Sequence, residues 1–115
     1  MPNQTTPAEG QLNQVFQALA DPTRRAVLQR LAKGPAPVKE LAEPFHMALP
    51  SFTQHLDVLE ASGLVRSKKV GRVRTYRISP RRLENAEHWL AKQRRLWEQR
   101  LDQLDNYLAT LKEQS

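Results

Sequence analysis

Cysteine is absent from the 115-residue sequence, and glycine occurs only four times. The lack of cysteine excludes disulfide bonds, thiolate metal sites and cysteine nucleophiles, and it is typical of a reducing compartment. The sequence also lacks a glycine-rich phosphate loop, a Ser–His–Asp arrangement and a cluster of metal ligands. We therefore expect a protein that is not an enzyme and that has no cofactor.

Long apolar runs are also missing. No stretch approaches the roughly 18 consecutive apolar residues of a membrane span. The N-terminal MPNQTTPAEG has neither the basic start nor the apolar core of a secretory signal. Residues 1–10 are polar, contain two prolines and show no periodicity, so they are expected to form a disordered tail. These features predict a cytoplasmic protein that does not contact a membrane.

Acidic residues are missing from one segment of the chain. Residues 66–82 hold eight of the 18 Lys and Arg residues and none of the 12 Asp and Glu residues. The net charge of +6 therefore comes from this segment, and the rest of the chain is slightly acidic. A local basic patch on a nearly neutral protein is typical of a polyanion-binding surface. A solvated charge run and a membrane-surface patch are the alternatives, although the segment lacks the pattern of a basic amphipathic helix.

The first sixty residues contain four helical patterns. The first helix is expected over about residues 11–20, and Asp21-Pro22 begins the second, which ends before Gly34. A short third helix covers about residues 38–45, and a turn leads to a fourth over residues 50–61. Two short helices joined by a tight turn have the order of a helix-turn-helix unit.

A hairpin and one long helix follow. LVRSKKVGRVRTYRIS is rich in strand-forming residues and has its only turn residue at Gly71, so it predicts a two-stranded hairpin. Pro80 begins a helix that runs to about residue 113. Its apolar residues form a heptad-like row at a spacing of seven: Leu83, Leu90, Trp97, Leu104 and Leu111. A helix of about 45 Å at 1.5 Å per residue is too long for the core of so small a domain.

These elements predict a mainly α protein with a small β-hairpin. Residues 11–79 form a winged helix-turn-helix DNA-binding domain, and residues 80–113 form a long dimerisation helix. Phe52, Leu56 and Leu59 hold the 50–61 helix on the core, while its polar front enters the major groove of double-stranded DNA. The basic wing, residues 66–77, supplies phosphate contacts. The predicted DNA-binding residues are Ser51, Thr53, Gln54, His55, Lys68, Lys69, Arg72 and Arg74.

The sequence also resembles a known family. LADPTRRAVLQRL, VKELAEPF, SFTQHLDVLEASGLV and GRVRTYRI resemble the ArsR-type winged-helix repressors of bacteria, over about residues 11–79. The resemblance implies a homodimer joined through its first and last helices, which binds an inverted-repeat operator and represses a promoter. By position, it assigns the four polar residues at 51 and 53–55 to operator contacts and Arg72 and Arg74 to the wing. The expected dimerisation residues are Leu12, Phe16, Leu90, Trp97, Leu101, Leu104 and Leu108.

Two departures from the family pattern are informative. Many members sense metals through a cysteine pair, which is absent here, and Glu84 and His88 alone are too few for a zinc site of three or four ligands. We therefore expect a regulator with no metal. Ala48 occupies a position where the family commonly has a Ser or Thr that caps the recognition helix. The missing cap lowers helix stability by about 1 kcal/mol.

Alternatives to this function remain. A winged-helix module that binds proteins and has lost operator binding is the main one, although it would be expected to have a neutral or acidic wing. The sequence does not decide between activation and repression of transcription. The signal that releases the protein from DNA is also left open. It is either an unknown small-molecule effector bound by the long helices or the abundance of the protein itself.

Overall fold

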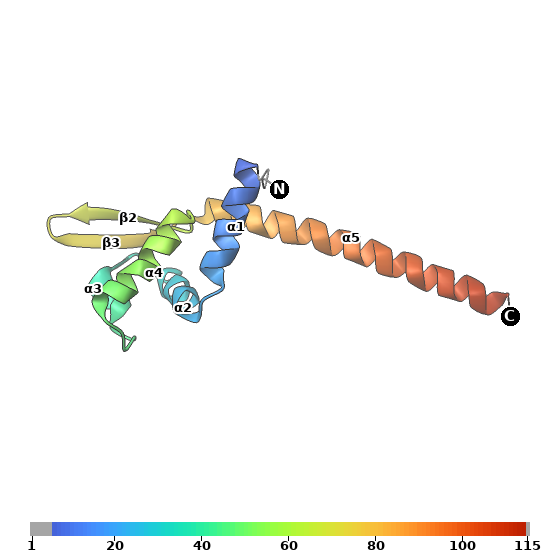
Figure 1. Ribbon diagram of the computed structural model, residues 1–115, viewed down its shortest axis with the longest axis horizontal. Helices are drawn as coiled ribbons and strands as arrows, with labels where there is room; N and C mark the ends of the chain where they lie inside the picture. The colour runs from blue at the N-terminus through green and yellow to red at the C-terminus, as the bar shows by residue number, and fades with distance from the viewer. Residues whose placement is uncertain (1–5, 115) are drawn as a thin grey trace, which may run out of the picture.

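The computed structural model describes residues 6–114, which form five helices and three short strands (Figure 1). A small body at one end carries a hairpin, and one long helix extends from it in the opposite direction. The molecule measures 75 × 35 × 23 Å along its principal axes. The elements are α1 (Pro7–Leu19), α2 (Pro22–Leu31), β1 (Ala36–Pro37), α3 (Val38–Ala42), α4 (Leu49–Ala61), β2 (Val65–Val70), β3 (Val73–Ile78) and α5 (Pro80–Glu113).

Helix α1 begins earlier than the sequence pattern predicts. It starts at Pro7, so residues 7–10, which were expected to be part of a disordered tail, are helical; residues 1–5 of that tail lie outside the described residues. Thr6 accepts a hydrogen bond from the Glu9 backbone N–H (3.1 Å), and the Glu9 carboxylate accepts one from the Thr6 N–H (3.3 Å). This reciprocal capping box, with proline in the first turn, explains the early start.

The other predicted helices are present with small changes in length. Asp21 caps α2 by accepting a hydrogen bond from the Arg24 backbone N–H (3.1 Å). Helix α3 ends at Ala42, three residues before the predicted end, since Pro44 cannot continue the backbone hydrogen bonding of a helix. Helix α4 starts one residue early at Leu49, and its N-cap residue Ala48 makes no side-chain cap, as expected.

The sheet has one more strand than predicted. Strands β2 and β3 form the expected antiparallel hairpin, with Val70 opposite Val73 at the tip and Val65 opposite Ile78 at the base. The two residues of β1 pair with β3 on its other side, so the strand order is β1-β3-β2. This short strand secures the segment before α3 to the wing, and α3 consequently lies alongside the hairpin (Figure 1).

The core lies where the first four helices meet the base of the hairpin. Phe52, Leu56 and Leu59, the predicted inward face of α4, are completely buried. The Phe52 ring packs against Phe45, with 5.4 Å between ring centroids. Because the inward face of α4 is fixed in this way, its opposite face is presented to solvent in a defined orientation. The other buried apolar residues are Val15, Ala18, Val27, Leu31, Ala36, Leu41, Leu64, Val65, Tyr76 and Ala86.

The turn between α4 and the hairpin depends on Gly63. Its φ of +80° lies in the left-handed region, and a Cβ placed there would be 2.6 Å from Cγ of Arg82. The Leu64 N–H then donates to the Leu59 carbonyl (3.2 Å), which closes the C-terminus of α4. Gly63 therefore permits both the backbone turn and the close approach of the Arg82 side chain from α5.

Gly63→Ala is expected to lower the free energy of unfolding by more than the 1–2 kcal/mol that a left-handed alanine costs, roughly, in the absence of a clash. The excess reflects the displacement of Arg82. Gly71→Ala is the matched control, because Gly71 also has a positive φ (+62°) but a Cβ added to it would have no neighbouring atom within 4 Å. Urea unfolding of both variants measures the difference, and equal losses would contradict a role for the Arg82 contact.

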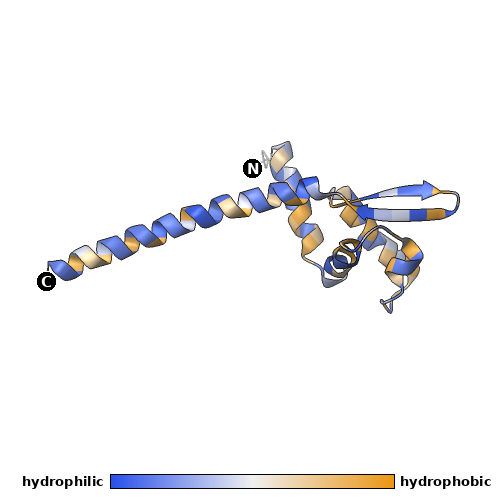
Figure 2. Ribbon diagram, turned by 180° about the vertical axis from the view of Figure 1, so that it is seen from behind, coloured by the Kyte–Doolittle hydropathy of each residue, from blue (hydrophilic) through white to orange (hydrophobic). Residues whose placement is uncertain are grey.

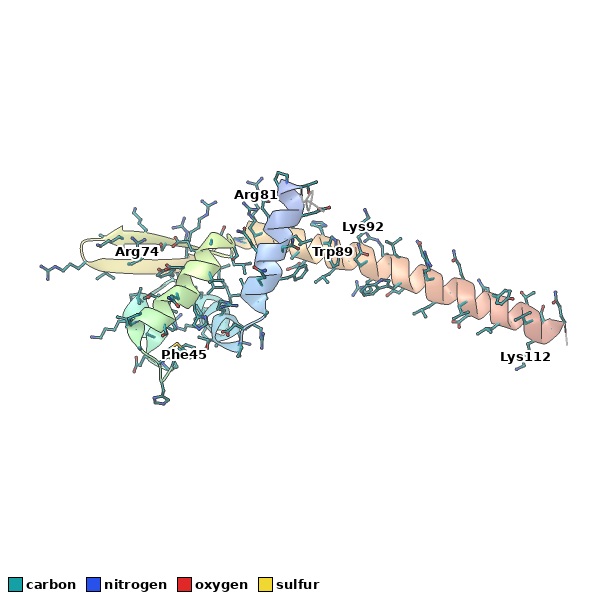
Figure 3. All side chains as sticks on the ribbon, viewed as in Figure 1. Phe45, Arg74, Arg81, Trp89, Lys92 and Lys112 are labelled. Carbon is teal, nitrogen blue, oxygen red and sulfur yellow. The ribbon has the colours of Figure 1, made fainter. Side chains whose placement is uncertain are left out.

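Helix α5 leaves the body after its first turns. Ala86 is its only buried residue among those described, and the Trp89 ring packs edge-on against Phe16 of α1, with 5.8 Å between centroids (Figure 3). Every described residue from 94 to 114 is exposed. None of the described helices is long and apolar enough to span a membrane.

Candidate nucleic-acid interface

The exposed face of α4 carries part of the predicted polar front. Ser51 and Gln54 are exposed, whereas Thr53 and His55 are half-buried. The Thr53 hydroxyl donates to the Pro50 carbonyl (3.0 Å), so it is partly committed to the helix itself. Its oxygen retains acceptor capacity. The geometry therefore leaves Gln54, with an amide that both donates and accepts, as the most freely presented base-reading side chain on α4.

His55 is held by a partner that the sequence pattern does not indicate. Nη1 of Arg24 lies 3.1 Å from Nδ1 of His55. A guanidinium can only donate, so Nδ1 must accept, and the imidazole proton is then on Nε2. A second approach, 3.8 Å from Nδ1 to Asp21 Oδ2, would need a proton on the same nitrogen. We assign Nδ1 as the acceptor in the shorter contact, from Arg24. Nε2–H of His55 is then left as a donor of fixed orientation.

Arg24 also joins α4 to the first helix. Its Nε donates to the Ala18 carbonyl and its Nη2 to the Gln17 carbonyl, both at 2.8 Å. These acceptors lie at the C-terminus of α1, where a cation is favoured by the helix dipole. The neighbouring Arg25 similarly donates to the Leu19 carbonyl (2.7 Å). Both arginines therefore stabilise the α1–α2 junction, and Arg24 positions His55 of α4 from there.

The charge of Asp21 is stabilised at the same junction. Partial burial alone would raise the pKa of Asp21, but the hydrogen bond from the Arg24 backbone N–H and the charge of the Arg24 guanidinium lower it below its ordinary value. The folded chain thus favours the ionised carboxylate that caps α2.

Asp21→Asn is expected to make stability less dependent on pH in acid. Because the folded pKa of Asp21 is lowered, its stabilising contribution is fully present above the ordinary value of 3.8 and disappears as the pH falls through the folded value. Asparagine retains the capping oxygen and removes only the charge. Urea unfolding at pH 7 and pH 3 checks this, and an identical pH response in the two proteins would contradict it.

The wing places like charges opposite one another. Lys69 faces Arg74 and Arg66 faces Arg77 across the antiparallel pair. Direct like-charge neighbours in a sheet are unfavourable in the free protein. Within residues 6–114, the side chains of Lys68, Lys69 and Arg72 make no hydrogen bond or ion pair. A polyanion would neutralise this surface and relieve the repulsion, which favours a phosphate-binding role for the wing.

A hydrogen-bond chain links the wing to α4. Arg74, labelled on the hairpin in Figure 3, donates from Nη1 to the Ser67 hydroxyl (2.8 Å). Both the hydroxyl and the backbone N–H of Ser67 donate to Oε2 of Glu60, at 2.7 and 3.1 Å. The chain fixes the hairpin relative to α4, so Arg74 has a structural contact in addition to its predicted phosphate role. Sequence reasoning missed Ser67 and Glu60, because they pair only through the tertiary fold.

The predicted dimerisation residues fall into two groups. Leu12 and Phe16 of α1 pack against the core and are only partly exposed. The α5 residues face solvent in the single chain, with exposed fractions from 47% for Leu90 to 60% for Leu101. Figure 2 shows apolar bands recurring along the polar surface of this helix. The exposed α5 members are Leu90, Trp97, Leu101, Leu104 and Leu108.

Comparison with known proteins supports the arrangement of α4 and the wing. Residues 19–68 match a family described as a helix-turn-helix domain. The regulator Rv2034 of Mycobacterium tuberculosis is 44% identical over 68 residues, which are 59% of this chain and 64% of Rv2034. The transcriptional repressor SdpR of Bacillus subtilis is 30% identical over 79 residues, which are 69% of this chain and 88% of SdpR.

Solved structures agree over more of the chain. A crystal structure of an ArsR family transcriptional regulator is 61% identical, with a TM-score of 0.75, and the match covers 77% of this chain and 92% of that one. This chain belongs to the ArsR family. A homodimeric winged helix-turn-helix DNA-binding domain from Mycobacterium bovis is 25% identical, with a TM-score of 0.61, and covers 89% of this chain and 92% of that one.

Membership of the ArsR family confirms the expected fold of this chain and its expected class, a transcriptional regulator. The winged helix-turn-helix and the long C-terminal helix are both present. Transcriptional regulators of this family are not enzymes. Among the residues that the structure describes, no three His, Cys, Asp or Glu side chains lie close enough together to hold a metal ion.

Proposed function

We propose that this ArsR-family protein is a homodimeric transcriptional repressor that binds an inverted-repeat operator in double-stranded DNA. The observation that carries the proposal is the pairing of two surfaces on one rigid body. Gln54 and Ser51 are exposed on a helix whose opposite face is fully buried, and the adjacent wing presents opposed cations whose described side chains form no ion pair. A helix in the major groove would read the sequence, while the wing would bind phosphates.

The long helix α5 supports the homodimer. Its 34 residues span about 51 Å at 1.5 Å per residue, and every described residue from 94 to 114 is exposed. Leu101, Leu104 and Leu108 expose a continuous apolar row there, a feature that monomeric proteins rarely retain. A two-fold dimer through this row and α1 would give two copies of α4, which matches the two half-sites of an inverted repeat.

Several finer points belong to the same proposal. The contact residues are Ser51, Thr53, Gln54 and His55 on α4 and Lys68, Lys69, Arg72 and Arg74 on the wing. The protein is proposed to act in the cytoplasm, without a membrane, a bound metal or a catalytic activity. Its occupancy of the operator would be set by an organic effector or by its own concentration.

The test is selection of bound duplexes from a random DNA pool, in zinc and in a chelator, followed by a salt titration on the selected duplex. A palindromic motif that is the same in both conditions is expected, with an affinity that falls steeply with salt. An absence of any enriched motif, with only weak salt-sensitive binding, would contradict operator binding. It would instead favour the alternative of a winged-helix protein-interaction module.

A further inference from the structure

An apolar groove opens beside the wing, between α3, the first residue of α4 and strand β3. It has a volume of about 930 Å³, and its apolar lining comes from Pro37, Val38, Ala42, Leu49 and Val73. Lys39, Arg72 and Arg74 also line it together with Glu43, so its edge carries three cations and one carboxylate. The groove is therefore an apolar site within a cationic surface.

Leu49, like Val73 of the wing, is an apolar residue of this groove that lies outside the core. Its side chain is 56% exposed and does not join the core, whereas Val38 and Ala42 pack partly against it. A polar residue at this position would leave the buried face of α4 intact. Leu49 continues the apolar lining formed by Pro37, Val38, Ala42 and Val73, and a contiguous exposed apolar surface points to an apolar ligand.

The position of Leu49 identifies that ligand. Leu49 is the first residue of α4, and side chains at the N-terminal end of a recognition helix are those that reach base edges. Helical side chains also lean toward the N-terminus, so Leu49 projects beyond the helix start. The C5-methyl group of thymine is the one apolar group that a base pair presents in the major groove.

We propose that Leu49 reads a thymine methyl group in each half-site of the operator, with Val38 and Val73 forming the walls of the methyl-binding site. This inference rests on the proposed function. The cations along the groove edge would bind the neighbouring phosphates. These contacts would position the operator so that the methyl group touches Leu49 when the wing and α4 bind DNA. Leu49 thus adds a base preference that hydrogen bonding by Gln54 alone does not provide.

The experiment uses the operator selected from the random pool. Each thymine is replaced in turn by uracil, which removes only the methyl group, at equivalent positions of both half-sites. Binding of the full-length protein is measured by fluorescence anisotropy. At one position the parent is expected to lose about fourfold in affinity per half-site, the effect of exposing one methyl group.

Variants assign that loss to Leu49. Leu49→Ala is expected to bind the thymine and uracil operators equally, and Leu49→Met, which keeps a long apolar side chain, to retain the discrimination. Val58→Ala is the matched control, because Val58 is also exposed on α4 but lies nine residues farther along, about 13 Å at 1.5 Å per residue. It should discriminate like the parent. Circular dichroism confirms that each variant is folded.

Two results would overturn the inference while operator binding stands. One is an operator in which no thymine-to-uracil change alters affinity. The other is a loss that persists undiminished in Leu49→Ala, which would place the methyl contact elsewhere. The proposed function fails at an earlier and separate step, when no duplex is selected from the pool, and the inference then fails with it.

Discussion

Replacing both Leu101 and Leu108 with glutamate is expected to convert the protein into monomers and to reduce operator affinity by about 10²–10⁴-fold. A dimer binds its second half-site as an intramolecular event at a high effective concentration, and a monomer loses this advantage. The apolar row of α5 is the surface that the double variant disrupts. Leu101 and Leu108 lie one heptad apart, and both are more than half exposed in the single chain.

The expected loss follows from the cost of burying charge. Two carboxylates per chain would enter an apolar interface with no partner, which costs several kcal/mol for each group. Stability of the winged domain should be unaffected, because every residue of α5 from 94 onward that the structure describes is exposed and none supports the core. Oligomeric state and operator binding should therefore change without loss of the fold.

Gln99→Glu combined with Asn106→Glu is the matched control for this variant. These residues have the same seven-residue spacing, are exposed and undergo the same change in charge. They are displaced by two positions, about 200° around the helix, from the apolar row. Analytical ultracentrifugation should find a dimer for the control and a monomer for the leucine variant. A leucine variant that remained dimeric would show that the row is not the interface.

Local signals in the sequence were sufficient for most of the fold. Asp21-Pro22 predicted the start of α2, Gly71 the hairpin tip, and the seven-residue spacing of apolar residues the length of α5. Each signal acts within a few residues of its own position. The early start of α1 has a local signal too, because Thr6-Pro7-Ala8-Glu9 has the spacing of a capping box, but the polar composition and the prolines around it favoured a tail.

The features that the sequence did not reveal are those that depend on tertiary contacts. Strand β1 is only two residues long and contains proline, so it becomes a strand only because β3 lies beside it. Arg24 and His55 are 31 residues apart, and their contact requires that α1, α2 and α4 pack first. Sequence reasoning consequently named His55 as a contact residue but could not see what orients it.

The same distinction applies to the proposed DNA contacts. The polar front of α4 and the basic wing were recognisable from residue types alone. The exposed Leu49 was not, because a leucine in a helix is ordinary until the structure places it outside the core and beside the cations of the wing. Exposure, rather than residue type, is what suggests a ligand there.

Gln54→Ala is expected to lower affinity for the selected operator by about five- to 150-fold per half-site, the range for one bidentate base contact, and to leave affinity for random DNA unchanged. Gln54 is exposed, and its amide can donate to and accept from one adenine at the same time. Its removal should therefore weaken sequence discrimination without altering phosphate contacts. Competition titrations against operator and random duplexes measure both affinities.

Arg72→Ala is the contrasting variant that shows whether base reading and phosphate binding are separate. Arg72 is exposed next to Gly71 at the wing tip, and its side chain makes no hydrogen bond or ion pair within residues 6–114. Its loss should weaken binding to operator and random DNA alike and flatten the salt dependence by about one unit per protomer, since one phosphate contact is removed. If Gln54→Ala instead lowered both affinities equally, or Arg72→Ala affected only the operator, the two roles would have to be exchanged. Base reading would then lie in the wing, and α4 would serve to position it.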